Sequence, residues 1–115
     1  MPPRDWRMRV EDILDAIAQI QGYVAGMTFD AFQADRKTID AVVRNITVIG
    51  EAANNVPPAI ADKHPEIPWK LMRDFRNVVV HRYFGLDLKV IWDTAQADIP
   101  PLVEPLQRLL ADRAD

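Results

Sequence analysis

The sequence predicts an all-α protein, an antiparallel bundle of four to five helices with a kink or break near Pro100. Apolar residues recur at helical spacing along almost the whole chain, and alternating strand patterns are nearly absent. Proline and glycine separate the periodic segments, as expected for short connections between helices. A length of 115 residues is typical of one domain, and 49% hydrophobic residues suffice for a core. We therefore expect a single helical domain over residues 1–115.

The first two segments are a long helix and a short one. The apolar stripe of the long helix consists of Val10, Ile13, Ile17, Ile20 and Val24. Gly22 and Gly26 weaken its end, and Thr28 is suited to cap a short helical turn over 28–35. Phe29 and Phe32 of that turn are expected to point inward.

Two further helices are expected before the last quarter of the chain. The stripe of the first, over about 36–56, comprises Ile39, Val42, Val43, Ile46, Ile49, Ala53 and Val56, and Pro57-Pro58 ends it. A proline-containing loop follows. The next helix is expected from Pro68-Trp69 to just before Gly85, with a core stripe of Leu71, Met72, Phe75, Val78 and Val79.

The C-terminal region keeps one apolar stripe in phase across two prolines. Its members are Leu88, Trp92, Ala95, Ile99, Leu102, Leu106 and Leu109. Pro100 and Pro101 interrupt helical hydrogen bonding and kink the axis. Because the phase is kept, we expect two nearly collinear segments or one kinked helix, without a reversal of direction.

The only basic stretch lies in the third long helix of an otherwise acidic chain. The net charge is -3, whereas residues 69–83 carry Lys70, Arg73, Arg76 and Arg82 against Asp74 alone. Local positive charge can attract phosphate even on an acidic protein. A basic cluster of this size also arises by chance, so charge alone does not decide between the two readings.

The same stretch contains Arg76, His81 and Tyr83 in the pattern R-x4-H-x-Y. On an ideal helix Arg76 and His81 lie ~140° apart, too far around the axis to grip one phosphate easily. Either the helix loosens after Val80, or the site is built from two copies of the chain. Arg82 favours loosening, because an unbroken helix would turn it toward the core stripe.

Each motif residue also has an ordinary structural interpretation. His81 suits the solvent-facing or C-terminal part of a helix. Arg76 suits an ion pair with Glu51 or Asp74, and Tyr83 suits the edge of a core. The polar face of the helix holds Lys70, Arg73, Asp74, Asn77 and His81.

Several classes of site are excluded by composition. The chain has no cysteine and no serine, which removes thiolate metal sites and serine or cysteine nucleophiles. His64 and His81 lack metal-ligand spacing, and the four glycines form no phosphate-binding loop. We expect no metal and no cofactor.

Metal-free cleavage of RNA remains open, because the 2′-hydroxyl of the substrate supplies the nucleophile. Histidine can move the protons and arginine can stabilise the transition-state charge. His81, Arg76 and the polar neighbour Asn77 would form a minimal set.

The chain carries no signal-peptide pattern and no run of ~18 apolar residues that could span a membrane. We expect a cytoplasmic protein without a membrane partner.

Three segments resemble one family. They are RNVVVHRY at 76–83, DAVVRNITVIGEAANNV at 40–56, and the tail DLKVIWDTAQADIPPLVEPLQRLL at 87–110. Together they are similar to the HepT-like toxins of the HEPN superfamily, over about residues 10 to 110.

The resemblance implies a homodimeric helical bundle in which Arg and His of both protomers line a shared cleft. It implies a metal-independent RNA endonuclease, the toxin of a type VII-like toxin–antitoxin pair that cleaves tRNA or mRNA. Arg76 and His81 would be catalytic and Asn77 supporting. Tyr83 matches the tyrosine that a cognate minimal nucleotidyltransferase antitoxin modifies with AMP. The remaining basic residues would bind RNA, namely Lys70, Arg73 and Arg82.

A different class of function stays open. The chain could be a non-catalytic helical adaptor that binds a nucleotidyltransferase partner or a nucleotide in the same cleft, and its acidic charge favours that reading. A purely structural helical dimer would need only the core stripes.

Overall fold

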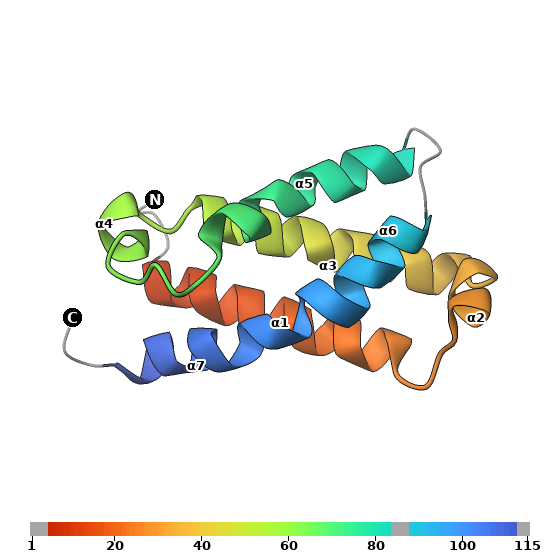
Figure 1. Ribbon diagram of the computed structural model, residues 1–115, viewed down its shortest axis with the longest axis horizontal. Coiled ribbons are helices and arrows are strands. Elements are labelled where there is room, and N and C mark those ends of the chain that lie inside the picture. Colours follow the sequence, from red (N-terminus) through yellow and green to blue (C-terminus); the bar gives the residue numbers. More distant parts are fainter. Residues whose placement is uncertain (1–4, 84–87, 113–115) are drawn as a thin grey trace.

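The computed structural model describes residues 5–83 and 88–112, and every regular element in these ranges is helical (Figure 1). The predicted all-α class is therefore confirmed. The elements are α1 (Trp6–Val24), α2 (Phe29–Gln33), α3 (Arg36–Asn54), α4 (Pro58–Ala61), α5 (Trp69–Tyr83), α6 (Leu88–Asp93), a π-helical turn (Thr94–Asp98), a 3₁₀ turn (Pro100–Leu102) and α7 (Val103–Ala111).

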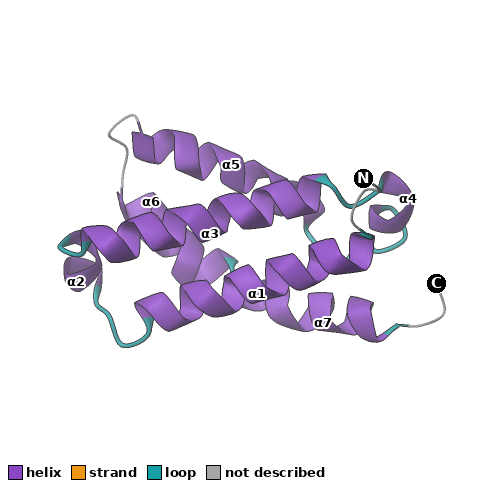
Figure 2. Ribbon diagram, turned by 180° about the vertical axis from the view of Figure 1, so that it is seen from behind, coloured by secondary structure: helices purple, strands orange, loops and turns teal. Residues whose placement is uncertain are grey.

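Helix α3 is the centre of the bundle. It packs against α1 on one side and α5 on the other, and successive long helices run in opposite directions (Figures 1 and 2). The segment from α6 to α7 returns across this layer, contacting α5 at its start and α1 at its end. At that end Arg7 of α1 donates from its guanidinium to the carbonyl oxygens of Leu110 and Asp112, at 3.0 and 2.8 Å. An arginine therefore satisfies carbonyl groups at the end of α7.

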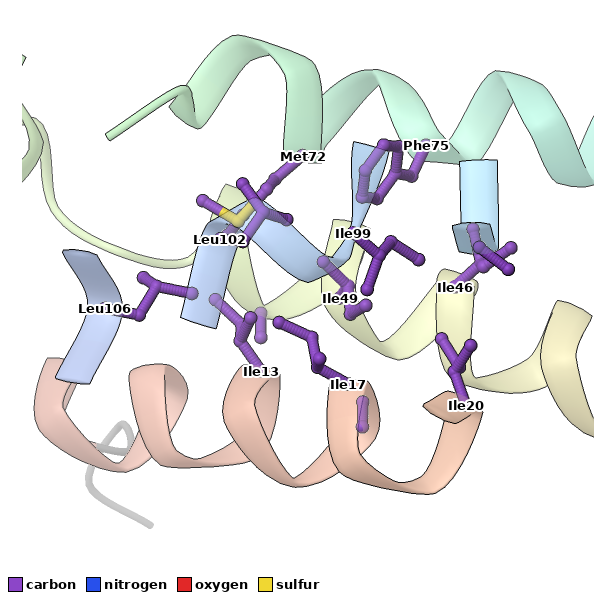
Figure 3. Packing of buried hydrophobic residues seen from close by; sticks show 14 of the residues in the cluster. Ile13, Ile17, Ile20, Ile46, Ile49, Met72, Phe75, Ile99, Leu102 and Leu106 are labelled. Atoms are coloured by element: carbon purple, nitrogen blue, oxygen red, sulfur yellow. The ribbon is translucent and has the colours of Figure 1, made fainter. Parts of the chain in front are cut away.

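The core is built from the apolar stripes that the sequence predicts. In Figure 3, Ile99 and Leu102 of the C-terminal segment lie between α1 and α5. The stripes of α1 and α3 are buried throughout, as are Met72 and Phe75 of α5. Burial of this many aliphatic side chains is the main stabilising term for a domain of this size.

Polar side chains cap the N-termini of α2 and α3. The Thr28 hydroxyl accepts a hydrogen bond from the Ala31 amide at 3.1 Å, as predicted, and Phe32 is fully buried. Phe29 is only partly buried, and both rings pack against Trp92. Asp35 caps α3, and the hydrogen bonds from Thr38 hold the pKa of its carboxyl below the usual value.

The C-terminal segment continues in one direction, as the unbroken stripe predicts. Within it the Ile99 amide donates to the Thr94 carbonyl, a wide turn, and the Leu102 amide donates to Ile99, a tight turn, each at 3.0 Å. The wide and tight turns offset one another, which keeps Ile99 and Leu102 on the buried face. Pro100 falls in the tight turn, where a helical amide is not required.

Three details differ from the prediction. Helix α3 ends at Asn54, two residues before the predicted end, and α4 forms inside the expected loop because Pro58 suits a first helical turn. Leu71 is not in the core: it is 39% exposed. It shares an edge of α5 with Val78, which is only partly buried, whereas the centre of the stripe passes through Met72 and Phe75.

Among the described helices, none combines the length and the apolar character that crossing a membrane would demand.

Alanine substitutions of Ile46 and of Leu71 should differ in their cost to stability, because one position is in the core and the other is at its edge. Ile46 is fully buried, so Ile46→Ala should lower the free energy of unfolding by about 2–5 kcal/mol. Leu71→Ala should cost less than about 1 kcal/mol, as expected for a largely exposed position. Urea denaturation of both variants checks this, and equal losses would contradict the placement of Leu71.

Candidate functional site

The start of α5 is fixed by a buried tryptophan. Trp69 is 5% exposed, and its indole Nε1 donates to the His64 carbonyl at 3.1 Å. The Met72 amide donates to the Pro68 carbonyl at 3.2 Å and begins the helical hydrogen bonding. Met72 and Phe75 are buried against the core, so the rotation of α5 about its axis is set. The opposite face is thereby turned outward.

The outward face carries the polar residues that the sequence predicts. Lys70, Asp74 and Asn77 are exposed, and Arg73 is half-buried. Lys70 Nζ lies 2.7 Å from Asp74 Oδ2, an ion pair within one helix. Lys70 and Arg73 also line a surface pocket of about 730 Å³ beside the α4–α5 connection. Among the side chains that the structure describes, which leave out residues 79–83, no three metal-ligating groups gather.

Arg76 pairs with a residue of the neighbouring helix. Its Nε lies 3.7 Å from Glu51 Oε1 of α3, and the two side chains are 54% and 55% exposed. Of the two partners that the sequence suggests, Glu51 is therefore the one observed, while Asp74 pairs with Lys70. With half of its side chain exposed, Arg76 remains accessible to a ligand from solvent.

Gly50 brings α3 close to the same arginine. A Cβ atom built on Gly50 would lie 2.9 Å from Arg76 Cγ and 3.4 Å from the Met72 carbonyl oxygen. A real Cβ would force one of these groups to move. Gly50 was an isolated glycine in the sequence; its role becomes visible only when α3 and α5 are placed side by side.

The positive charge of the basic stretch is partly balanced. Counting along the chain finds only Asp74 as an acid within residues 69–83. The fold adds Glu51 from α3, so Lys70 and Arg76 each face a carboxylate. The third cation of residues 69–78, Arg73, is half-buried.

For the second half of the motif, only the backbone is described. Helix α5 continues to Tyr83, so a loosening after Val80, the first of the two alternatives that the sequence leaves open, is not observed. The side chains of residues 79–83 lie outside the described part of the chain, including His81, Arg82 and Tyr83.

An uninterrupted helix fixes one geometric relation in the motif. Residues five apart are separated by ~140° around the axis of a regular α-helix. Arg76 lies on the side of α5 that faces α3, beside Glu51. Position 81 lies on the other side of the polar face.

The described residues form an all-helical bundle with an exposed polar face on α5, an architecture that many protein families share. Comparison with known families then gives the particular one. The family model described as "Ribonuclease HepT-like" matches residues 13–109, so the chain belongs to the HepT-like ribonuclease family. This membership supports ribonuclease activity in general.

Individual relatives cover nearly the whole chain. "Putative RNase MJ0127" of Methanocaldococcus jannaschii is 38% identical over 112 residues, 97% of this chain and 93% of the relative. "Probable ribonuclease HepT" of Thermococcus cleftensis is 41% identical over 100 residues, 87% of this chain and 91% of the relative. "Putative RNase TTE0752" of Caldanaerobacter subterraneus is 34% identical over 104 residues, 90% and 93% of the two chains. No solved structure matches the chain.

Adding a methyl group at Gly50 should destabilise the protein relative to the same change at Gly22. Alanine is better than glycine in a helix by about 1 kcal/mol, and a Cβ at Gly22 meets nothing within 4 Å. At Gly50 overpacking costs about 1–3 kcal/mol. Urea denaturation should therefore show Gly50→Ala to be less stable than Gly22→Ala. Equal stability would mean that α3 and α5 do not approach closely at this point.

Proposed function

We propose that the protein is a metal-independent RNA endonuclease, the toxin of a type VII-like toxin–antitoxin pair, acting as a homodimer of one-domain chains. The observation that carries this proposal is the position of Arg76, exposed on α5 inside the region matched by a ribonuclease family. The names of the relatives, which describe RNases, agree with it.

The proposed reaction needs no nucleophile from the protein. The 2′-oxygen of the RNA forms a bond to the adjacent phosphorus, and the bond from phosphorus to the 5′-oxygen breaks. A proton leaves the 2′-hydroxyl, and a proton is delivered to the departing 5′-oxygen. His81 is proposed to move these protons, because imidazole titrates near neutral pH. Arg76 is proposed to stabilise the negative charge that develops on the phosphate oxygens, and Asn77 to supply a hydrogen bond nearby.

The geometry of a regular helix supports the proposed homodimer. One copy of α5 holds positions 76 and 81 ~140° apart, which disfavours one phosphate meeting both side chains of one protomer. Two copies of α5 facing each other allow Arg76 of one protomer and His81 of its partner to approach the same phosphate.

The rest of the basic stretch is proposed to bind the flanking RNA. Lys70 and Arg73 are accessible on the same face of α5 and line the pocket next to it. Arg73 lies one helical turn from Arg76, so a strand crossing Arg76 can continue to it. Arg82 is proposed to contribute from the other end of the helix.

Tyr83 is proposed as the site of silencing by a nucleotidyltransferase antitoxin. AMP attached two residues from His81 would add bulk and negative charge where an RNA phosphate must bind. This step requires ATP and the partner enzyme, which transfers the adenylyl group to the phenolic oxygen and releases pyrophosphate.

One observation favours a second candidate, a non-catalytic adaptor for a nucleotidyltransferase. The net charge is -3, and Glu51 and Asp74 further reduce the positive potential along α5. Such an adaptor would form a stable complex with its partner and would cleave no RNA at any protein concentration.

The purified chain, incubated with tRNA and an mRNA transcript in the presence of EDTA, should release discrete fragments. His81→Ala and Arg76→Ala should each lower the rate by about 10²–10⁴-fold, because general acid–base catalysis and charge stabilisation are of this size. Gel analysis of time courses measures the rates.

Arg108→Ala is the matched control, since Arg108 also pairs with a glutamate at 3.7 Å but lies on α7. It should cleave like the parent. Mass spectrometry of the parent first establishes that Tyr83 carries no AMP, because a modified toxin would be inactive. Full activity of His81→Ala would contradict the catalytic proposal, and an unmodified parent that never cleaves would favour the adaptor.

A further inference from the structure

Two consecutive residues of α3 lie beside the side chain of Arg76. Gly50 leaves room for its aliphatic stem, since a Cβ there would approach Arg76 Cγ to 2.9 Å. Glu51 faces its guanidinium, with Oε1 3.7 Å from Nε. One residue therefore admits the stem close to α3, and the next places a carboxylate beside the charged end.

The atom that Glu51 approaches matters for what the arginine can still bind. A guanidinium has one N–H on Nε and four on the two terminal nitrogens. A carboxylate at Nε leaves the terminal pair free, and that pair matches two oxygens of a phosphate. The contact, at 3.7 Å longer than a hydrogen bond, places Glu51 on the Nε side of the guanidinium and not on the terminal donors that an RNA phosphate would use.

The contact is too exposed to matter much for stability. Ion pairs between half-exposed side chains contribute little to the free energy of unfolding. An unrestrained arginine, however, loses rotamer entropy before it can hold a phosphate in one geometry. A group that restrains it in advance lowers this cost at the moment of reaction.

The other glutamate–arginine pair at the same distance is different in kind. Arg108 and Glu104 also lie 3.7 Å apart, but four residues apart on α7, with side chains 71% and 79% exposed. The Arg76–Glu51 pair, in contrast, joins two helices at the point where Gly50 admits the arginine stem.

We propose that Glu51 is a positioning residue that orients Arg76 for the RNA phosphate, and that Gly50 provides the close approach that makes this possible. This inference rests on the proposed ribonuclease function. Glu51 itself touches neither the phosphate nor the reacting atoms.

The test is a double-variant cycle in the cleavage assay. Glu51→Ala should lower kcat about 10- to 100-fold with little change in KM, because misplacing a catalytic group by about 1 Å costs up to about 100-fold. In an Arg76→Lys background, where no planar guanidinium remains to orient, the same change should alter kcat less than about twofold. Glu104→Ala, the control, should leave kcat unchanged.

The outcomes distinguish the positioning role of Glu51 from the proposed ribonuclease site itself. An inactive Arg76→Ala with an unaffected Glu51→Ala overturns the positioning role alone. Equal losses from Glu51→Ala in both backgrounds would show that Glu51 acts independently of Arg76 and also overturn it. A fully active Arg76→Ala would overturn the ribonuclease site itself.

A measurement without catalysis tests the same contact. In ¹⁵N NMR spectra the Nε–H signal of Arg76 should move or broaden in Glu51→Ala, and that of Arg108 should not. The reverse substitution, Glu104→Ala, should affect Arg108 alone. An Arg76 signal that is the same in the parent and in Glu51→Ala would contradict the proposal, whatever the cleavage assay shows.

Discussion

The close approach of α3 and α5 at Gly50 is the constraint on which the candidate site depends. Because Gly50 has no side chain, the stem of Arg76 can lie against the backbone of α3. The same approach carries Glu51 to the guanidinium. Burial of Ile46 and Ile49 on one side, and of Met72 and Phe75 on the other, holds the two helices together. The core packing that joins α3 and α5 thus also determines how Arg76 is presented on the surface.

The sequence predicted the helices well because each stripe is a local property. Burial of Val10 through Val24 in α1 and the Thr28 cap follow from spacing and side-chain chemistry within one segment. The absence of a reversal near Pro100 could also be predicted, since the stripe keeps its phase. The wide and tight turns that preserve the phase could not, because they are backbone adjustments forced by packing.

The candidate site was predictable in its residues but not in its arrangement. Arg76, His81 and Tyr83 are visible as a pattern, and Glu51 could be suggested as a partner. The choice of Glu51 over Asp74, and the part played by Gly50, depend on how two helices meet. Leu71 was predicted to lie in the core stripe and is largely exposed, because a helical wheel does not show whether a neighbouring element covers that edge. Arg82 was interpreted as a sign of helix loosening for the same reason.

Because α5 continues without a break to Tyr83, we propose that one cleavage site is assembled from two chains. The most direct test mixes two inactive variants, Arg76→Ala and His81→Ala, as co-purified heterodimers carrying different tags. If Arg76 of one chain works with His81 of the other, one of the two symmetric sites is intact, and roughly half of the parent activity should return. A heterodimer as inactive as either parent variant, beside an active heterodimer of two unmodified chains, would contradict the claim.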